Sequence, residues 1–141
     1  MTRLNHYNVL LVEDEMLLMQ SLSRHIESLE AGFKVVCQAS NGEDAWKCLK
    51  KENIHLVMTD IRMPVMDGLT LAKRIHEQYP HILTVILTGY ADFDYAREAL
   101  KQGVFDYMLK PVTMEDLENT LGRVRLHLQK FYELEEDPAL V

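Results

Sequence analysis

Several features are scarce in this sequence of 141 residues, and each scarcity excludes a class of protein. No apolar run approaches the ~20 residues that a membrane-spanning helix requires. The first residues lack the long apolar stretch of a secretory signal. Lys and Arg number 15 against 22 Asp and Glu, a formal net charge of −7, which argues against a nucleic-acid surface on this chain itself. We therefore expect a cytoplasmic protein with no membrane partner.

The sequence has only two cysteines, and its histidines form no metal-binding motif. Cys37 falls in a strand-like run and Cys48 in a helix-like one. Because cytosolic proteins keep their thiols reduced, we predict two buried free thiols rather than a disulfide. Neither cysteine has a partner at metal-binding spacing, and none of the six histidines forms an HExxH pair. The sequence predicts no zinc site, and histidines at the surface or at sheet edges.

Five short apolar runs alternate with segments of helical periodicity. The runs cover residues 7–12, 34–39, 55–59, 83–87 and 104–108. Strict alternation of strands and helices predicts an α/β fold, a doubly wound five-stranded parallel sheet with five helices on its two faces. The length fits one domain, and the composition (48% hydrophobic, 26% charged residues) is typical of a globular protein.

Charged and hydroxyl side chains follow these apolar runs at the points where the strands should end. Glu13 and Asp14 follow the first run, Asp60 the third, and Lys110 the fifth, while Thr88 ends the fourth. The carboxyl ends of parallel strands meet at one edge of the sheet, where such folds place their functional crevice. The sequence therefore predicts one site that combines three carboxylates with an ammonium group.

Three neighbouring carboxylates repel one another, and a divalent cation relieves that repulsion. Oxygen donors alone favour Mg²⁺, although the pair Glu13-Asp14 by itself is also typical of a helix start. A metal-held Asp60 can attack phosphorus to give an acyl phosphate. Lys110 would then neutralise the added charge, unless it is an ordinary surface lysine. Pro111 after it indicates a fixed geometry, including a cis bond.

The motifs around these residues resemble the receiver domain of two-component response regulators, from about residue 7 to residue 130. The matching segments are 10–15 (LLVEDE), 59–64 (TDIRMP) with Asp67-Gly68, 87–89 (LTG) and 106–111 (DYMLKP). Each segment is weak evidence alone, but their order and their positions at strand ends make the match specific. The resemblance implies a flavodoxin-like sheet with strand order 2-1-3-4-5.

The resemblance also implies a role for each residue of the site. Asp60 would be the phosphoacceptor, with Asp14 and Asp60 as direct Mg²⁺ ligands and Glu13 as a ligand through water. Arg62 would contribute its backbone carbonyl to the metal. Lys110 would contact the phosphoryl group, Thr88 would be the switch hydroxyl, and Tyr107 would be the switch aromatic. Considered by themselves, Thr88 is typical of a cap or turn and Tyr107 of a strand edge.

The implied function is that of a signalling switch rather than an enzyme. A sensor histidine kinase would transfer its phosphoryl group to Asp60, and the domain would then control an output. Residues 88–96 resemble receivers attached to AraC-type DNA-binding domains, so DNA binding would belong to an output domain absent from this chain. We expect a receiver in residues 1–130, and in 131–141 the end of the last helix with the start of an acidic linker. An excised receiver is favoured over a stand-alone one.

The last helix is predicted to run from residue 113 to 134, long enough for its end to project from the sheet. Its apolar stripe has the spacing of a coiled-coil seam, and we hypothesise that it forms a homodimer or contacts an output domain. The alternative is that the stripe covers the sheet. The stripe consists of Met114, Leu117, Leu121, Val124, Leu128 and Phe131.

Two other functions share this fold class. Mg²⁺-dependent phosphohydrolases that form an aspartyl phosphate also use a strand-end Asp and a Lys, but they typically carry a second Asp where this chain has Arg62. Flavodoxin-like proteins that bind flavin place a phosphate-binding loop after the first strand. Here that loop is Glu13-Asp14-Glu15, which would repel a phosphate in the absence of a metal.

Overall fold

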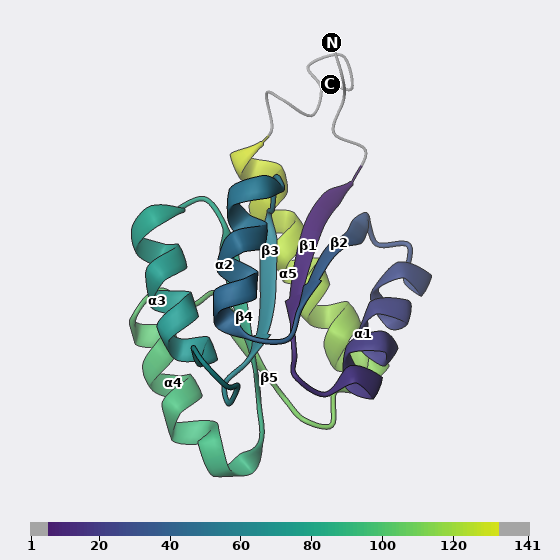
Figure 1. Cartoon of the computed structure of the whole chain (residues 1–141). Helices are drawn as coiled ribbons and strands as arrows, with labels where there is room; N and C mark the ends of the chain where they lie inside the picture. The colour runs from purple at the N-terminus through teal and green to yellow at the C-terminus, as the bar shows by residue number, and fades with distance from the viewer. Residues whose placement is uncertain (1–5, 133–141) are drawn as a thin grey trace.

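A computed structural model of the chain describes residues 6–132 and shows a parallel sheet between two layers of helices (Figure 1). The strands are β1 (Tyr7–Val12), β2 (Phe33–Ala39), β3 (Leu56–Asp60), β4 (Leu83–Thr88) and β5 (Asp106–Leu109). The α-helices are α1 (Met16–Ser28), α2 (Gly42–Lys51), α3 (Gly68–Gln78), α4 (Phe93–Lys101) and α5 (Met114–Phe131), and a 3₁₀ turn, η1 (Tyr90–Asp92), precedes α4. The strand order is β2-β1-β3-β4-β5. Both the α/β class and this order confirm the predictions.

The two faces of the sheet are buried by different helices. Leu22 of α1 and Leu121 of α5 pack with Leu11 and Met58 on one face. Leu49 of α2 and Leu71 of α3 pack with Leu10 on the other, which α4 also covers. The residues of β3 and β4 are almost all buried, as expected of strands covered on both faces. All five strands run in the same direction, so their carboxyl ends meet at one edge.

Three helices begin at residues whose side chains accept a hydrogen bond from the helix backbone. The side chains of Asn41, Asp67 and Thr113 accept from the amides three residues on, at the starts of α2, α3 and α5. Each satisfies an amide that has no partner within the helix. After β2, β3 and β5, loops with such caps lead from the carboxyl end of the strand into the next helix, which helps to hold the functional edge in place.

Two predicted bounds are wrong by a few residues. The last strand begins at Asp106, not at residue 104, because the amide of Val104 donates to the carbonyl of Ala99 and closes α4 instead. The last helix ends at Phe131. Residues 133–141, which hold the predicted end of that helix and the acidic linker, lie outside the described residues.

The apolar stripe of α5 covers the sheet, so the alternative to a coiled-coil seam is correct for its central part. Leu117, Leu121, Val124 and Leu128 are buried. Only the two ends of the stripe are exposed: Met114 is 40% and Phe131 52% exposed. The four central residues therefore have no free surface for a partner helix.

The end of α5 does not project but packs against the amino end of the sheet. The ring of Tyr132, which follows α5, contacts the rings of Tyr7 and His55 at centroid distances of 6.3 and 5.2 Å. His55 is buried, and its Nδ1 accepts a hydrogen bond from the amide of Asn8 at 2.9 Å. The prediction of surface or edge histidines is therefore wrong for His55, because sequence spacing does not show which residues close the far end of a sheet.

The prediction of free thiols is also wrong, since the structure joins Cys37 and Cys48 in a disulfide. Strand β2 and helix α2 pack together and bring the two Cα atoms to 6.7 Å, within the range that a disulfide spans. The redox state of a compartment does not show which cysteines the fold brings together, and here packing of β2 against α2 pairs them. Among the described residues, no helix is long and apolar enough to cross a membrane.

Candidate functional site

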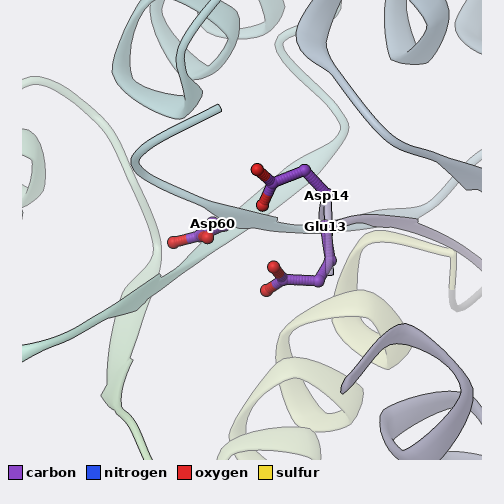
Figure 2. A group of neighbouring side chains, drawn as sticks. All are labelled: Glu13, Asp14 and Asp60. Carbon is purple, nitrogen blue, oxygen red and sulfur yellow. The ribbon is translucent and has the colours of Figure 1, made fainter. Parts of the chain in front are cut away.

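Three carboxylates meet at the carboxyl edge of the sheet, as the sequence predicts (Figure 2). Glu13 and Asp14 follow β1, and Asp60 is the last residue of β3. One carboxylate oxygen of each lies within 4.8 Å of the others. Glu13 is buried, Asp60 is half-buried and Asp14 is exposed. The group therefore has a closed inner side and an open outer side.

Lys110 joins this group from the end of β5. Its Nζ lies 3.0 Å from Glu13 Oε1 and 3.0 Å from Asp60 Oδ2. The Lys110 amide donates to the carbonyl of Thr88 at 2.7 Å, and the Lys110–Pro111 peptide bond is cis, as the sequence indicates. Its backbone is thus held by β4, and its ammonium group is held at the carboxylates by these two contacts, with the side chain 25% exposed.

The charges within this group shift two pKa values. Burial raises the pKa of Glu13, and the charge of Asp60 adds to that rise, while the hydrogen bond from Lys110 opposes it. Burial lowers the pKa of Lys110, but hydrogen bonds to Glu13 and Asp60 outweigh this and raise it overall. One ammonium group therefore only partly compensates for three carboxylates, and a divalent cation would complete the compensation.

The donor set fits a hard cation. All candidate ligand atoms are carboxylate oxygens, the type that Mg²⁺ prefers, and the exposed side leaves room for the waters that this ion retains. Within residues 6–132 this is the one cluster of acidic, histidine or cysteine side chains close enough to hold a metal. Glu13, Asp14 and Asp60 are therefore the side chains available to bind Mg²⁺.

Adding Mg²⁺ should stabilise the fold. A ligand that binds only the folded state adds about 1.4 kcal/mol to the free energy of unfolding at ten times its dissociation constant. We expect Tm to rise with Mg²⁺ in thermal unfolding of the wild type. Asp14→Asn should lose most of this rise, because it removes an exposed ligand without opening the core. Glu118→Gln, which neutralises an exposed carboxyl on α5, is the matched control; an equal loss there would mean that Mg²⁺ only screens the net negative charge.

The two predicted switch residues lie on neighbouring strands, β4 and β5. Thr88 is buried, and its Oγ1 donates to the Gly89 carbonyl at 3.1 Å. Tyr107 is half-buried on the edge strand, with its ring edge-on to Phe93 at a centroid distance of 5.6 Å. Tyr107 therefore has the edge packing expected of its position. The roles of both residues in switching stay predictions.

Two further residues shape the loop after Asp60. The amide of Gly68 donates to the carbonyl of Ile61 at 2.8 Å, and a Cβ at Gly68 would collide with the Asp60 carbonyl. Glycine is therefore required there by close approach of the backbone. The side chain of Arg62 points to Asp92, with Nε 2.8 and 2.9 Å from the two carboxylate oxygens. Asp92 could not be singled out from the sequence, because its partner is 30 residues away. The role of the Arg62 carbonyl as a metal ligand stays a prediction.

Comparison with known proteins identifies the family. A family model described as the response regulator receiver domain matches residues 9–122. The chain therefore belongs to the receiver domains of two-component response regulators, as its motifs indicate. Domains of this family are signalling switches that work with histidine kinases and bind Mg²⁺ at an acidic pocket.

Similar proteins include regulators of transcription. The chain is 33% identical over 124 residues to the uncharacterized transcriptional regulatory protein YesN of Bacillus subtilis. The matched segment covers 88% of this chain and 34% of YesN. It is 36% identical over 127 residues to the DNA-binding transcriptional regulator NtrC of Proteus hauseri. The matched segment covers 89% of this chain and 25% of NtrC. The chain thus spans about a third or less of these relatives.

The fold also matches solved receiver structures. The REC domain of AraT, a response regulator from Geobacillus stearothermophilus, superposes with a TM-score of 0.82 at 33% identity, over 88% of this chain and 96% of that one. A response regulator receiver domain protein from Clostridium thermocellum gives a TM-score of 0.79 at 29% identity, over 91% and 98%. These matches therefore cover nearly the whole of both solved chains and most of this one.

Proposed function

We propose that this domain accepts a phosphoryl group on Asp60 from a sensor histidine kinase and changes conformation in response. The observation that carries the proposal is that Asp60 lies close to two other carboxylates and contacts the Lys110 ammonium group. No other grouping in the described part of the chain combines a partly exposed carboxylate, a metal-binding set and a cation. Membership of the receiver family supports the same assignment.

In the proposed reaction, one oxygen of Asp60 attacks the phosphorus of a phosphohistidine. The new P–O bond forms as the P–N bond breaks, and the electron pair of that bond returns to the imidazole nitrogen of the kinase, which takes up a proton. Bound Mg²⁺ would supply neutralisation of the charge on the phosphoryl oxygens. Glu13, Asp14, Asp60 and the Arg62 carbonyl would hold it. Lys110 would exchange part of its contact with Asp60 for a phosphoryl oxygen.

The proposed switch involves the neighbouring strands. A phosphoryl group on Asp60 adds negative charge and strong acceptor oxygens beside Thr88. The Thr88 hydroxyl would donate to one of these oxygens in place of the Gly89 carbonyl, and Tyr107 would turn into the space that Thr88 leaves. Phosphorylation would act by shifting an existing equilibrium between two conformations. The domain would act as a signalling switch and not as an enzyme. The only reactions that it would carry out by itself are its own phosphorylation from a small phosphodonor and the slow loss of that phosphoryl group.

The output is proposed to be control of transcription. Support comes from YesN and NtrC, whose names describe transcriptional regulators that extend well beyond the matched segment. DNA binding would reside in such a further domain, of AraC type according to the sequence resemblance of residues 88–96. The receiver would occupy residues 1–130. A homodimer also stays a prediction, and it would use side chains other than the buried central stripe of α5.

The alternative phosphohydrolase function has little support. Such enzymes typically carry a second Asp two residues after the nucleophile, whereas Arg62 occupies that position here and its side chain binds Asp92. The acidic loop after β1 likewise argues against a flavin phosphate.

Intact-mass measurement tests the proposed function. Wild-type protein incubated with acetyl phosphate and Mg²⁺ should gain the mass of one phosphoryl group, and the same mixture with excess EDTA should gain none. Dependence on Mg²⁺ is expected because the carboxylates would otherwise repel the donor. If the protein gains no mass in the presence of Mg²⁺ but steadily releases inorganic phosphate, the result would favour the phosphohydrolase. If it neither gains mass nor releases phosphate, the result would contradict both functions.

A further inference from the structure

An ion pair joins the loop after β3 to the start of α4. Arg62 Nε donates to both carboxylate oxygens of Asp92, at 2.8 and 2.9 Å, and Nη2 lies 2.7 Å from Oδ1. The Asp92 side chain is 11% exposed, whereas that of Arg62 is 70% exposed. The contact therefore has the directed, multiply bonded geometry that makes arginine–carboxylate pairs stronger than most surface pairs.

The two partners lie in the loops that follow Asp60 and Thr88, the residues of the proposed switch. Arg62 follows Asp60 by two residues, and Asp92 follows Thr88 by four. Asp92 occupies the N-cap position of α4, but its side chain makes no capping hydrogen bond there. Its carboxylate is committed to Arg62, although a capping bond to the helix amides is the usual role of Asp at this position.

The segment from Thr88 to Asp92 is anchored at both ends in the structure. At one end, the Thr88 carbonyl accepts a hydrogen bond from the Lys110 amide at 2.7 Å, and the Thr88 hydroxyl donates its single proton to the Gly89 carbonyl. At the other end, Asp92 is held by Arg62, whose own loop is fixed beside Asp60 by the hydrogen bond from Gly68 to Ile61. If Thr88 is to reach a phosphoryl oxygen on Asp60, this segment must move, and the ion pair resists that movement.

We propose that the Arg62–Asp92 pair is a latch that holds residues 88–92 in the arrangement of the unphosphorylated state. Both residues are positioning residues for the switch, and the inference rests on the proposed phosphorylation of Asp60. A hollow of about 410 Å³, lined by Met63, Leu69 and Tyr95 among others, lies beside the pair and gives the start of α4 room to move. Opening the latch favours the switched conformation by whatever free energy the pair contributes to the unswitched one.

The test is a titration with beryllofluoride, a phosphoryl mimic, at saturating Mg²⁺. The amide NMR signals of Thr88 and Gly89 report both the affinity for the mimic and the conformation of the segment. Asp92→Asn and Arg62→Gln each remove one charge of the ion pair and keep the Arg62 carbonyl. We expect each variant to bind the mimic about two- to fivefold more tightly, the upper part of the range for an exposed arginine–carboxylate pair with good geometry. Without the mimic, their amide signals should lie displaced from the wild-type positions toward the bound ones. The double variant should equal either single variant, because both remove the same contact.

A second arginine pair provides the matched control. Arg123 Nη2 lies 2.6 Å from Asp106 Oδ2, between α5 and β5 and away from both loops. Arg123→Gln should leave the affinity and the Thr88 signal unchanged, and Arg62→Lys, which keeps the charge without the planar fork, should fall between wild type and Arg62→Gln.

Three outcomes would overturn the latch. Unchanged or weaker binding by Asp92→Asn and Arg62→Gln is one, and an equal gain in Arg123→Gln is another. Full additivity in the double variant is the third, because it would mean that the two residues act separately. If the wild type itself fails to bind beryllofluoride, the proposed phosphorylation of Asp60 is overturned and the latch with it.

Discussion

Asp60→Asn should abolish uptake of a phosphoryl group from acetyl phosphate, with no added mass under conditions that load the wild type completely. An amide oxygen lacks the charge needed to attack phosphorus, and the substitution also removes one of the three metal ligands. Asparagine keeps the size of the side chain at the end of β3, so the fold should remain. Intact-mass spectra with and without Mg²⁺, combined with thermal unfolding, measure both properties.

The control for this prediction is Asp94→Asn, which neutralises an exposed carboxyl in the first turn of α4. It should take up the phosphoryl group as the wild type does. An adduct that persists in Asp60→Asn would place the acceptor elsewhere. Treatment with hydroxylamine would then identify its chemistry, since this nucleophile cleaves an acyl phosphate and leaves a phosphate ester of a hydroxyl group, such as that of Thr88, intact.

Lys110→Met should destabilise the metal-free protein at neutral pH by about 2 kcal/mol, because it leaves a buried carboxylate without its cationic partner. Glu13 is 2% exposed and bonds Lys110 Nζ at 3.0 Å. Denaturant unfolding in EDTA measures the effect. Lys101→Met is the matched control: its ammonium group lies 3.9 Å from Glu98 on the exposed face of α4, and such pairs contribute roughly 0.2–1 kcal/mol at most.

The effect of Lys110→Met should depend on pH in a defined direction. The pKa of Glu13 is already raised above 4.5 in the folded state, and loss of the ammonium group raises it further. A folded state that binds a proton more tightly than the unfolded state gains stability as pH falls from the folded pKa to the unfolded value. The variant should therefore recover toward the wild type as pH falls toward 4.5.

A second substitution checks the cause. In Lys110→Met combined with Glu13→Gln, the uncompensated charge is absent, so most of the lost stability should return at neutral pH. If the double variant is less stable than Lys110→Met, the role of Lys110 in the fold lies in its packing and not in its charge. Addition of Mg²⁺ should also restore part of the stability of the single variant, because the ion supplies the missing positive charge.

The sequence by itself determined the order of the elements and the membership of the site. Apolar runs of strand length alternate with segments of helical period, and that alternation permits little besides a parallel sheet with helices on both faces. In such a sheet all strands end at one edge, so residues directly after a run must lie together there whatever the details of packing. Glu13, Asp14, Asp60 and Lys110 are of this kind, which is why local sequence was sufficient to group them.

Only the tertiary structure decided how side chains from distant segments pair. The stripe of α5 is equally compatible with a seam and with a buried face, and it is contact with the sheet that buries Leu121 and leaves Phe131 exposed. The disulfide of Cys37 and Cys48, and the burial of His55, depend on which surfaces meet. The Arg62–Asp92 pair depends on the paths of two loops that are 30 residues apart. The physical reason is the range of the forces: periodicity and strand-end position act within one element, whereas ion pairs and packing depend on distances that the whole fold sets.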